Sequence, residues 1–469
     1  MQLANRLQKH LDQRKVRYEL RLHEPTDTLE EAASASNLDP HNLARAVLLE
    51  DDRGLLLAVL PAHHLLDFQA LKQALGRDLR PAPHPVVAAT FHDCEPRSVP
   101  AIGEPWGLPT VVDNQLFGEG DICFEPGHHR ALVCLSRQDF ERLHEDSRRL
   151  DLSRPLSVLE SRDPRDFVLP GNLERSHPIL ALRPASDIRH EIEAIERLPA
   201  MPEMARRLLR VRNDPHATIH DLADIVAVDP SLTAQVIRYA RSAFFNYQGR
   251  IDTLDQAIGR VLGFDNALSM CLGLAASRTF RNPADGPLGL QAFWRHATYS
   301  AALAQALATA LRARLAINPG MAYLAGLLHN FGFLLAGHLF RSEFFLLNRV
   351  VAANPQIPVP LIEKRVMGVE HTEMGGWLMS AWEMPEPVIT SVTEHHNETY
   401  AGEHAMYANL VLLVDHLLRA EGIGDGADSE PPPLVLNALG LDLETAREIC
   451  TRVLESAEAL DAMARQLAA

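Results

Sequence analysis

The stretch "AGLLHNFG", residues 325–332, decides how the C-terminal half of this chain is interpreted. It is an apolar helical segment that ends in the pair His329-Asn330. A His-Asx pair that a helix directs into a bundle core is one way in which helical proteins hold a divalent metal, because imidazole nitrogens and side-chain oxygens are its ligands. An aspartate would offer a charge and two oxygens, whereas Asn330 offers one neutral carbonyl oxygen. The sequence therefore raises the question of which metal chemistry such a site keeps.

Further candidate ligands follow on either side of this stretch, each on or beside an amphipathic helical pattern. The chain has 22 histidines, so any one of them alone is more often a core or surface residue than a ligand. The order His, His-Asn, His, His-His, Asp is much harder to produce by chance. We therefore expect one pocket to collect the side chains of His296, His329, Asn330, His371, His395 and Asp415, with His396 adjoining His395.

Length and charge limit the possible classes of protein. The chain has 469 residues, of which 46% are hydrophobic, and a formal net charge of −16. The length predicts two or three domains. The acidic balance disfavours broad electrostatic binding to nucleic acid or to an anionic membrane, so we expect neither DNA nor a membrane as partner.

The five cysteines are odd in number, far apart and without a CxxC pair. This pattern predicts a reducing compartment and argues against a disulfide framework or a zinc ribbon. The N-terminal residues form a charged amphipathic helix and not a signal peptide, and no run of about 18 apolar residues suggests a transmembrane helix. We therefore expect a cytoplasmic protein.

Pattern changes along the chain predict a multidomain fold. Residues 1–149 mix helical and strand patterns, including a hairpin around residues 51–54, and predict an α+β domain. Residues 150–187 contain five prolines and predict a linker, or a strap that packs on the domain surfaces through the apolar pieces "FVLP" and "PILAL". Residues 188–420 are helical in pattern, and residues 421–469 predict a helical extension of that all-α domain.

The helical half resembles the HDOD domain, a mostly non-catalytic bacterial signalling relative of the HD-type phosphohydrolases. The resemblance rests on "LPAMP" (198–202), "DLADIVAVDPSLTAQVIRYARSAFF" (221–245), "AGLLHNFGFLL" (325–335) and "HTEMGGWLMSAWEMPEPVITSVTEHHN" (371–397). It covers about half of the chain. It implies a bundle of helices, protein partners in signalling and a site where a divalent metal could bind.

Two positions depart from the catalytic branch of that superfamily. Asn330 stands where the metal-binding Asp is usual, and Phe333 stands where a Lys that can pair with phosphate is common. Both changes remove charge from one site. They predict that hydrolysis is lost or much weakened, while the histidines and Asp415 could still bind one metal ion.

Residues 1–145 resemble the YbaK/prolyl-tRNA-synthetase-associated editing domain, which deacylates mischarged tRNA. The matching pieces include "LARAVLLE" (43–50) and "DCEPRSVPAIGEPWGLPTVVD" (93–113). The resemblance implies a pocket that involves Arg45, Arg97, Pro100 and Gly103. Arg45 stands where the family carries a Lys, and Arg97 where it carries a Gly. The pocket is thus expected to be degenerate, although it could still bind a tRNA end or an aminoacyl ligand.

These observations favour a regulatory protein in which both ancestral active sites have degenerated and the helical domain acts through protein contacts. The alternative is an enzyme, either an aminoacyl-tRNA deacylase or a metal-dependent phosphohydrolase of the HD superfamily. A pure nucleic-acid binder is disfavoured by the acidic charge. The sequence assigns no catalytic residue.

Overall fold

The structure, a computed structural model, describes residues 3–23, 33, 36, 38–39, 42–95, 98–118, 120–160, 188–190, 198–241, 245, 247–277, 279–280, 282–283, 286–354, 357–424 and 431–468. The chain forms two compact units. The first comprises Met1–Pro184, Leu346–Val366 and Gly426–Ser429. The second comprises Ala185–Phe345, Met367–Asp425 and Glu430–Ala469. Most of the segment predicted to link them, residues 161–187, lies outside the described residues.

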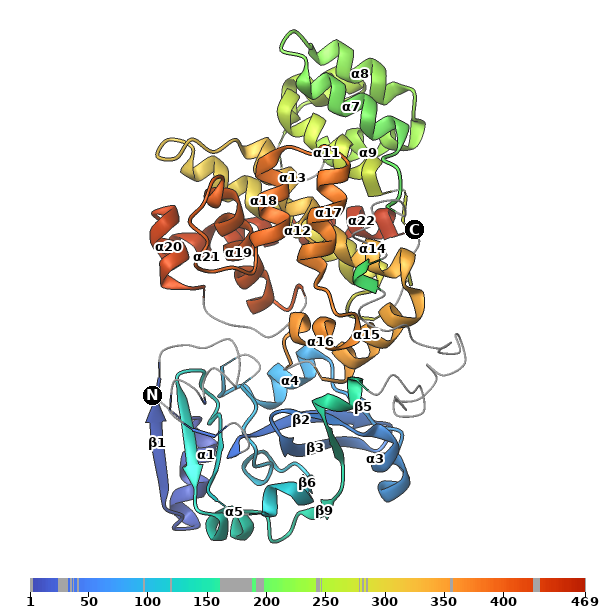
Figure 1. Cartoon of the computed structure of the whole chain (residues 1–469). Coiled ribbons are helices and arrows are strands. Elements are labelled where there is room, and N and C mark those ends of the chain that lie inside the picture. Colours follow the sequence, from blue (N-terminus) through green and yellow to red (C-terminus); the bar gives the residue numbers. More distant parts are fainter. Residues whose placement is uncertain are drawn as a thin grey trace. The chain divides into compact units, whose positions relative to one another are not determined.

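The first unit is α+β, as predicted (Figure 1). Its strands are β1 Tyr18–Leu22, β2 Ala44–Asp51, β3 Gly54–Pro61, β4 His64–Leu66, β5 Arg80–Pro81, β6 Thr110–Asp113, β7 Ile122–Phe124, β8 Ala131–Leu135, β9 Arg148–Leu150 and β10 Ser153–Pro155. Its helices are α1 Asn5–Gln13, α3 Phe68–Leu75, α4 His84–Thr90, α5 Arg137–Leu143 and α16 Val359–Val366, with short 3-10 turns at Glu104–Trp106, Asn114–Phe117 and Leu156–Glu160.

The main sheet of this unit has the order β5-β2-β3-β6-β9. The predicted hairpin is its centre: β2 and β3 are antiparallel and Asp51 pairs with Gly54. Gly54 has φ 110°, a backbone conformation that residues other than glycine rarely adopt, which explains a glycine at this turn. Two short sheets, β1-β8-β7 and β10-β4, complete the unit, so the first residues of the predicted linker form a strand on β4.

The sequence argued against a disulfide framework, whereas the structure pairs two of the five cysteines. Cys123 on β7 and Cys134 on β8 face each other in the antiparallel register and form a disulfide. Eleven residues separate them in sequence. No CxxC pattern marks such a pair, because only the strand register brings the two thiols together. The cysteine argument for a reducing compartment therefore no longer holds.

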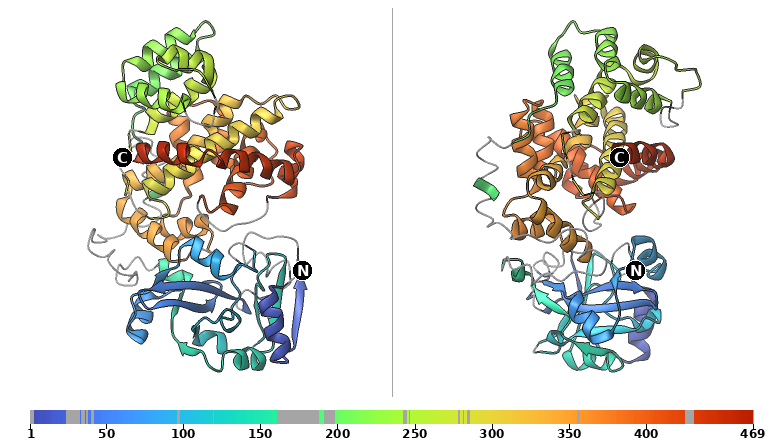
Figure 2. Two further views of the ribbon diagram at one scale, coloured as in Figure 1. Left: turned by 180° about the vertical axis from the view of Figure 1, so that it is seen from behind. Right: turned by 90° about the vertical axis from the view of Figure 1, so that its right-hand side faces the viewer.

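The second unit is all-α in its described residues (Figures 1 and 2). Its helices are α7 Glu203–Asn213, α8 Ile219–Ala227, α9 Pro230–Ala240, α10 Leu254–Gln256, a π-helical turn at Ala257–Leu262, α11 Phe264–Ser277, α12 Leu290–Leu311, α13 Pro319–Leu328, α14 Phe331–Leu339, α17 His371–Ala381, α18 Glu386–Glu394, α19 Ala405–Ala420, α20 Pro433–Leu439, α21 Leu443–Leu454 and α22 Ala457–Ala468. Helix α15, Arg341–Ala353, contributes residues to both units.

Local signals set the ends of these helices. A break separates α8 from α9, because Asp229 caps α9 by accepting a hydrogen bond from Leu232 N and Pro230 occupies the first helical position. Asn318 and Pro319 begin α13 in the same way. Within the unit, α7, α8 and α9 form a group at one end, whereas α12 runs through the middle of the bundle (Figures 1 and 2).

One segment, Pro319–Leu339, is long and apolar enough to cross a membrane by length and composition alone. It is 94% buried in its most apolar window. The segment is also not one helix, since α13 ends before His329 and α14 begins after Asn330. Burial and the break both indicate core helices of the bundle, as expected from the sequence.

Candidate metal centre and the Arg45 site

Three helices of the second unit bring His296, His329 and Asp415 together. His296 lies in α12, Asp415 lies in α19 and His329 forms the C-cap of α13. Asp415 Oδ1 lies 3.2 Å from His296 Nε2 and 3.4 Å from His329 Nε2. All three residues are buried, and their ligand atoms lie within 4.8 Å of one another.

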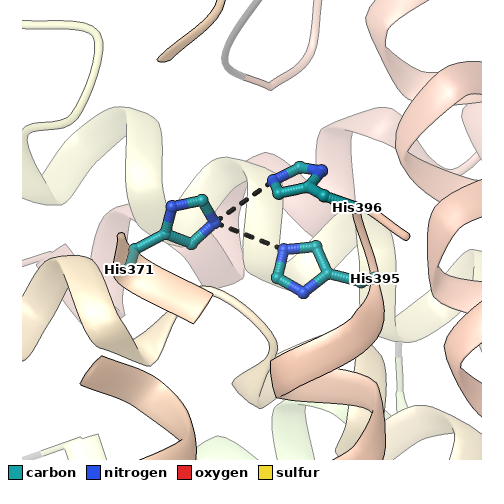
Figure 3. A group of neighbouring side chains, drawn as sticks. All are labelled: His371, His395 and His396. Atoms are coloured by element: carbon teal, nitrogen blue, oxygen red, sulfur yellow. Dashed lines mark hydrogen bonds between the residues drawn. The ribbon is translucent and has the colours of Figure 1, made fainter. Parts of the chain in front are cut away.

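A second trio lies beside the first and consists of His371, His395 and His396 (Figure 3). His371 is the first residue of α17, and the other two follow α18. His371 Nε2 lies 3.3 Å from His395 Nε2 and 3.2 Å from His396 Nε2. The rings of His329 and His395, 5.0 Å apart, join the two trios. We call the six residues the His/Asp cluster.

Backbone carbonyls determine which ring nitrogens can act as ligands. His329 Nδ1 lies 2.8 Å from Gly326 O, and His395 Nδ1 lies 3.0 Å from Val392 O. A carbonyl only accepts, so both Nδ1 atoms carry the proton and, in a neutral ring, the lone pair is on Nε2. Both Nε2 atoms face the interior of the cluster, which is how metal-binding histidines are oriented by a second partner.

The cluster has the donor set of a metal site. His371 Nε2 carries at most one proton and cannot donate it to both His395 and His396, so the two short contacts cannot both be hydrogen bonds donated by His371. Neither oxygen of Asp415 accepts a well-aligned hydrogen bond from the described residues, although both are buried. A cation between these atoms would satisfy them, and imidazole-rich sites suit transition metals better than Mg²⁺.

The electrostatics agree with this arrangement. Burial lowers the pKa of His395 well below its usual value, and the neighbouring His329 and His371 lower it further. Burial and the two neighbouring histidines do the same for the pKa of His396. Burial alone would raise the pKa of Asp415, but His329, His296 and Arg419 hold it well below the usual range. A neutral imidazole and an ionised carboxylate are the forms that bind metal.

Asn330 changes the role of His296. The amide Nδ2 of Asn330 lies 3.2 Å from His296 Nδ1. An amide N–H donates there, which leaves the proton of a neutral His296 on Nε2, directed at Asp415. His296 Nε2 then carries a proton and offers no lone pair to a metal, whereas the amide rotated by 180° would leave Nε2 unprotonated. An Asn at this position, where the resemblance implies an Asp, would thus affect the tautomer of a candidate ligand as well as the charge of the site.

Two glycines of "AGLLHNFG" allow the helices to approach. A Cβ at Gly326 would lie 2.6 Å from Ser300 O on α12, and one at Gly332 would lie 1.9 Å from His371 O on α17. Phe333 stacks on the His371 ring at 4.1 Å between centroids. An aromatic ring therefore packs directly against a candidate ligand.

Arg45 lies in a buried polar site of the first unit. It is the second residue of β2, and it donates from Nη2 to His64 O at 2.7 Å and to Asn354 Oδ1 at 2.8 Å. Burial lowers its pKa to about 9. The resemblance to editing domains indicated Arg45, whereas nothing in the sequence indicated Asn354, which lies 309 positions further along the chain.

The place of the remaining residues in this pocket stays a prediction, and one of them lies outside the described residues. Arg97 lies outside them. Pro100 and Gly103 flank Ala101 and Ile102, which pack in a core cluster with Ala44 and Ala46. Val47, which follows Arg45 on its side of β2, packs in a different cluster together with Ala353. None of the described contacts joins Arg45 to Pro100 or Gly103.

The sequence reasoning also missed Arg419 near the His/Asp cluster. Its guanidinium lies 3.7 Å from Asp415 Oδ2, one helical turn further along α19. The (i, i+4) spacing of an acid and a base on one helix would have indicated this pair.

Comparison with protein families confirms both resemblances. Residues 198–398 match the HDOD domain, and residues 23–143 match the aminoacyl-tRNA editing domain.

Individual relatives extend this result. A Marinobacter aquaeolei VT8 protein of known crystal structure, described as a candidate signal transduction protein, is 30% identical, with 99% of both chains covered and a TM-score of 0.71. An HDOD domain protein with unknown function from Geobacter sulfurreducens is 24% identical over 60% of this chain and 97% of its own, with a TM-score of 0.50, and supports the fold alone. An uncharacterized protein of Treponema pallidum (strain Nichols) is 27% identical over 248 residues, and this chain covers 46% of its length.

Proposed function

We propose that this chain is a signalling regulator whose His/Asp cluster binds a divalent transition metal without hydrolysing phosphoesters. The chain belongs to the aminoacyl-tRNA editing family through residues 23–143 and to the HDOD family through residues 198–398. The helical unit acts through protein partners. The editing-type unit no longer turns over mischarged tRNA rapidly and serves to bind a tRNA end or an aminoacyl ligand. The signal transduction description of the Marinobacter relative supports this assignment.

The observation that carries the proposal is the burial of five of the six cluster residues, all except His396, which is partly exposed. His329, His371 and His395 are 0% exposed, and His296 and Asp415 are almost as deeply buried. Metal sites that catalyse keep an open position for substrate, whereas structural sites are closed. A metal bound here would supply a Lewis acid. The chain's own residues surround that position with imidazole rings and the Phe333 ring, and Arg419 directs its charge to Asp415.

Metal content and phosphoesterase activity test the proposal together. The full chain, purified without chelator, should retain Zn²⁺, Mn²⁺ or Fe²⁺ by elemental analysis, and His329→Ala should lose it. His416→Ala is the matched control, because His416 is buried on α19 next to Asp415 but is not one of the six cluster residues. The same preparations should not hydrolyse bis-p-nitrophenyl phosphate or cyclic dinucleotides faster than His329→Ala does.

Each result has a clear meaning. Bound metal without turnover supports the proposal. Absence of metal from the wild type after reconstitution overturns the metal assignment. Turnover that requires His329 would instead make the chain a phosphohydrolase, and turnover of mischarged tRNA by the full chain would make it a deacylase.

A further inference from the structure

Two hydrogen-bond donors in the first unit converge on a single carbonyl oxygen. The oxygen is Asn354 Oδ1, and it accepts from Arg45 Nη2 at 2.8 Å and from the backbone N–H of Leu66 at 3.1 Å. One donor comes from β2 and the other from β4. Preorganised donors at about 2.7–3.1 Å from one oxygen are the arrangement with which proteins bind and polarise a carbonyl group.

The site around this oxygen is built from buried and ordered groups. Arg45 is 3% and Asn354 is 2% exposed. Arg45 is held in place by its hydrogen bond to His64 O, and the Asn354 amide nitrogen donates to Val350 O at 3.0 Å. The residue before it, Ala353, packs in the same core cluster as Val47 of β2. The site is therefore part of the core and not a chance surface contact.

The carboxamide in this site belongs to the chain itself. A side-chain amide presents the same planar carbonyl as an ester or a peptide, so it can occupy a place that suits either. Asn354 lies within residues 198–398, which match the HDOD family, whereas Arg45 and Leu66 lie within the residues that match the editing domain. One family's segment thus supplies the group that fills a site in the other family's domain.

We propose that Arg45 and the Leu66 N–H form a binding site for the carbonyl of an ester or amide ligand, and that Asn354 is the built-in occupant that closes it. A ligand reaches these donors only when the segment Leu346–Val366, which belongs to the first unit, releases Asn354. The site is then a point of regulation, because whatever moves this segment controls access to Arg45. The inference is independent of metal binding at the His/Asp cluster.

Chemical accessibility of Arg45 tests the proposal in the full chain. Phenylglyoxal modifies free guanidinium groups, and mass spectrometry measures the rate at Arg45. Wild type should react slowly there, and Asn354→Ala should react about tenfold faster or more, because a hydrogen bond from a charged group is lost. Acetamide in large excess should restore the protection in Asn354→Ala, since it refills the site with a carboxamide. Methylammonium, which only donates, should not.

Two controls separate the site from general loosening. Arg77, which is paired with Asp51 at the end of the β2–β3 hairpin, should react at the same rate in wild type and in every variant. Asn354→Asp should protect Arg45 at least as well as wild type, because a carboxylate accepts from the same two donors. The proposal is overturned if Asn354→Ala leaves the Arg45 rate unchanged, if acetamide fails to protect, or if Asn354→Asp reacts as fast as Asn354→Ala.

Discussion

Gly332, the last residue of "AGLLHNFG", is where α14 meets the first residue of α17. An alanine there would place its Cβ 1.9 Å from His371 O, 2.6 Å from its carbonyl carbon and 2.8 Å from its Cα. All three atoms are backbone, so no side-chain rotation can relieve the contact. Gly332→Ala therefore tests whether this approach of two helices supports both the bundle and the cluster.

The magnitude follows from the overlap. Cβ atoms essentially never approach other heavy atoms closer than 3.0 Å, so α14 and α17 must separate locally by about 1.1 Å. Overpacking typically costs about 1–3 kcal/mol, and a backbone clash belongs at the upper end. At about 2–4 °C per kcal/mol for a unit of this size, the helical unit should melt roughly 6–12 °C lower. Because His371 moves with α17, metal affinity should fall about tenfold or more.

The assay is a melting curve of the full chain, with and without metal, beside a matched glycine. Gly259→Ala is that control, because its Cβ would meet only Ile219 at 3.6 Å, an ordinary contact. It should leave the Tm unchanged or raise it slightly, as alanine favours helix over glycine. A Gly332→Ala protein that melts within about 2 °C of wild type would show that α14 and α17 are not packed this closely.

Three further results are expected. The free energy of unfolding of metal-free protein should decrease as the pH falls below about 6.5, because His395 and His396 take up protons in the unfolded chain but stay neutral in the folded one. Each histidine should contribute a slope of up to about 1.4 kcal/mol per pH unit. Urea titrations at several pH values measure this slope, and His396→Gln should halve it. Asn330→Asp should raise metal affinity about 10–100-fold in calorimetric titrations, because a carboxylate accepts a hydrogen bond from His296 Nδ1–H and leaves Nε2 unprotonated for metal binding. Unchanged affinity would exclude this tautomer argument. Asp229→Ala should cost about 1 kcal/mol of helical-unit stability by removing the α9 cap, while metal content stays the same, and a loss of metal would contradict this local role.

The sequence by itself determined the local features of this protein. Helix caps such as Asp229 with Pro230, and the turn before Gly54, act through neighbouring backbone groups, so their residues are sufficient to predict them. The order of histidines also predicted which helices supply the candidate ligands. Helical periodicity carries that information for His296 and Asp415, because a side chain on the apolar face of an amphipathic helix must point into the core, whereas His329 and His395 lie at the ends of their helices.

The tertiary structure decided everything that depends on register and on distant segments. Cys123 meets Cys134 only because β7 and β8 pair in one register. His329 presents Nε2 only because the backbone places Gly326 O against Nδ1. Arg45 receives its partner Asn354 from 309 residues away. Such contacts have no local signature, since their free energy is gained only after both segments have folded and the position of each is set by the packing of the rest.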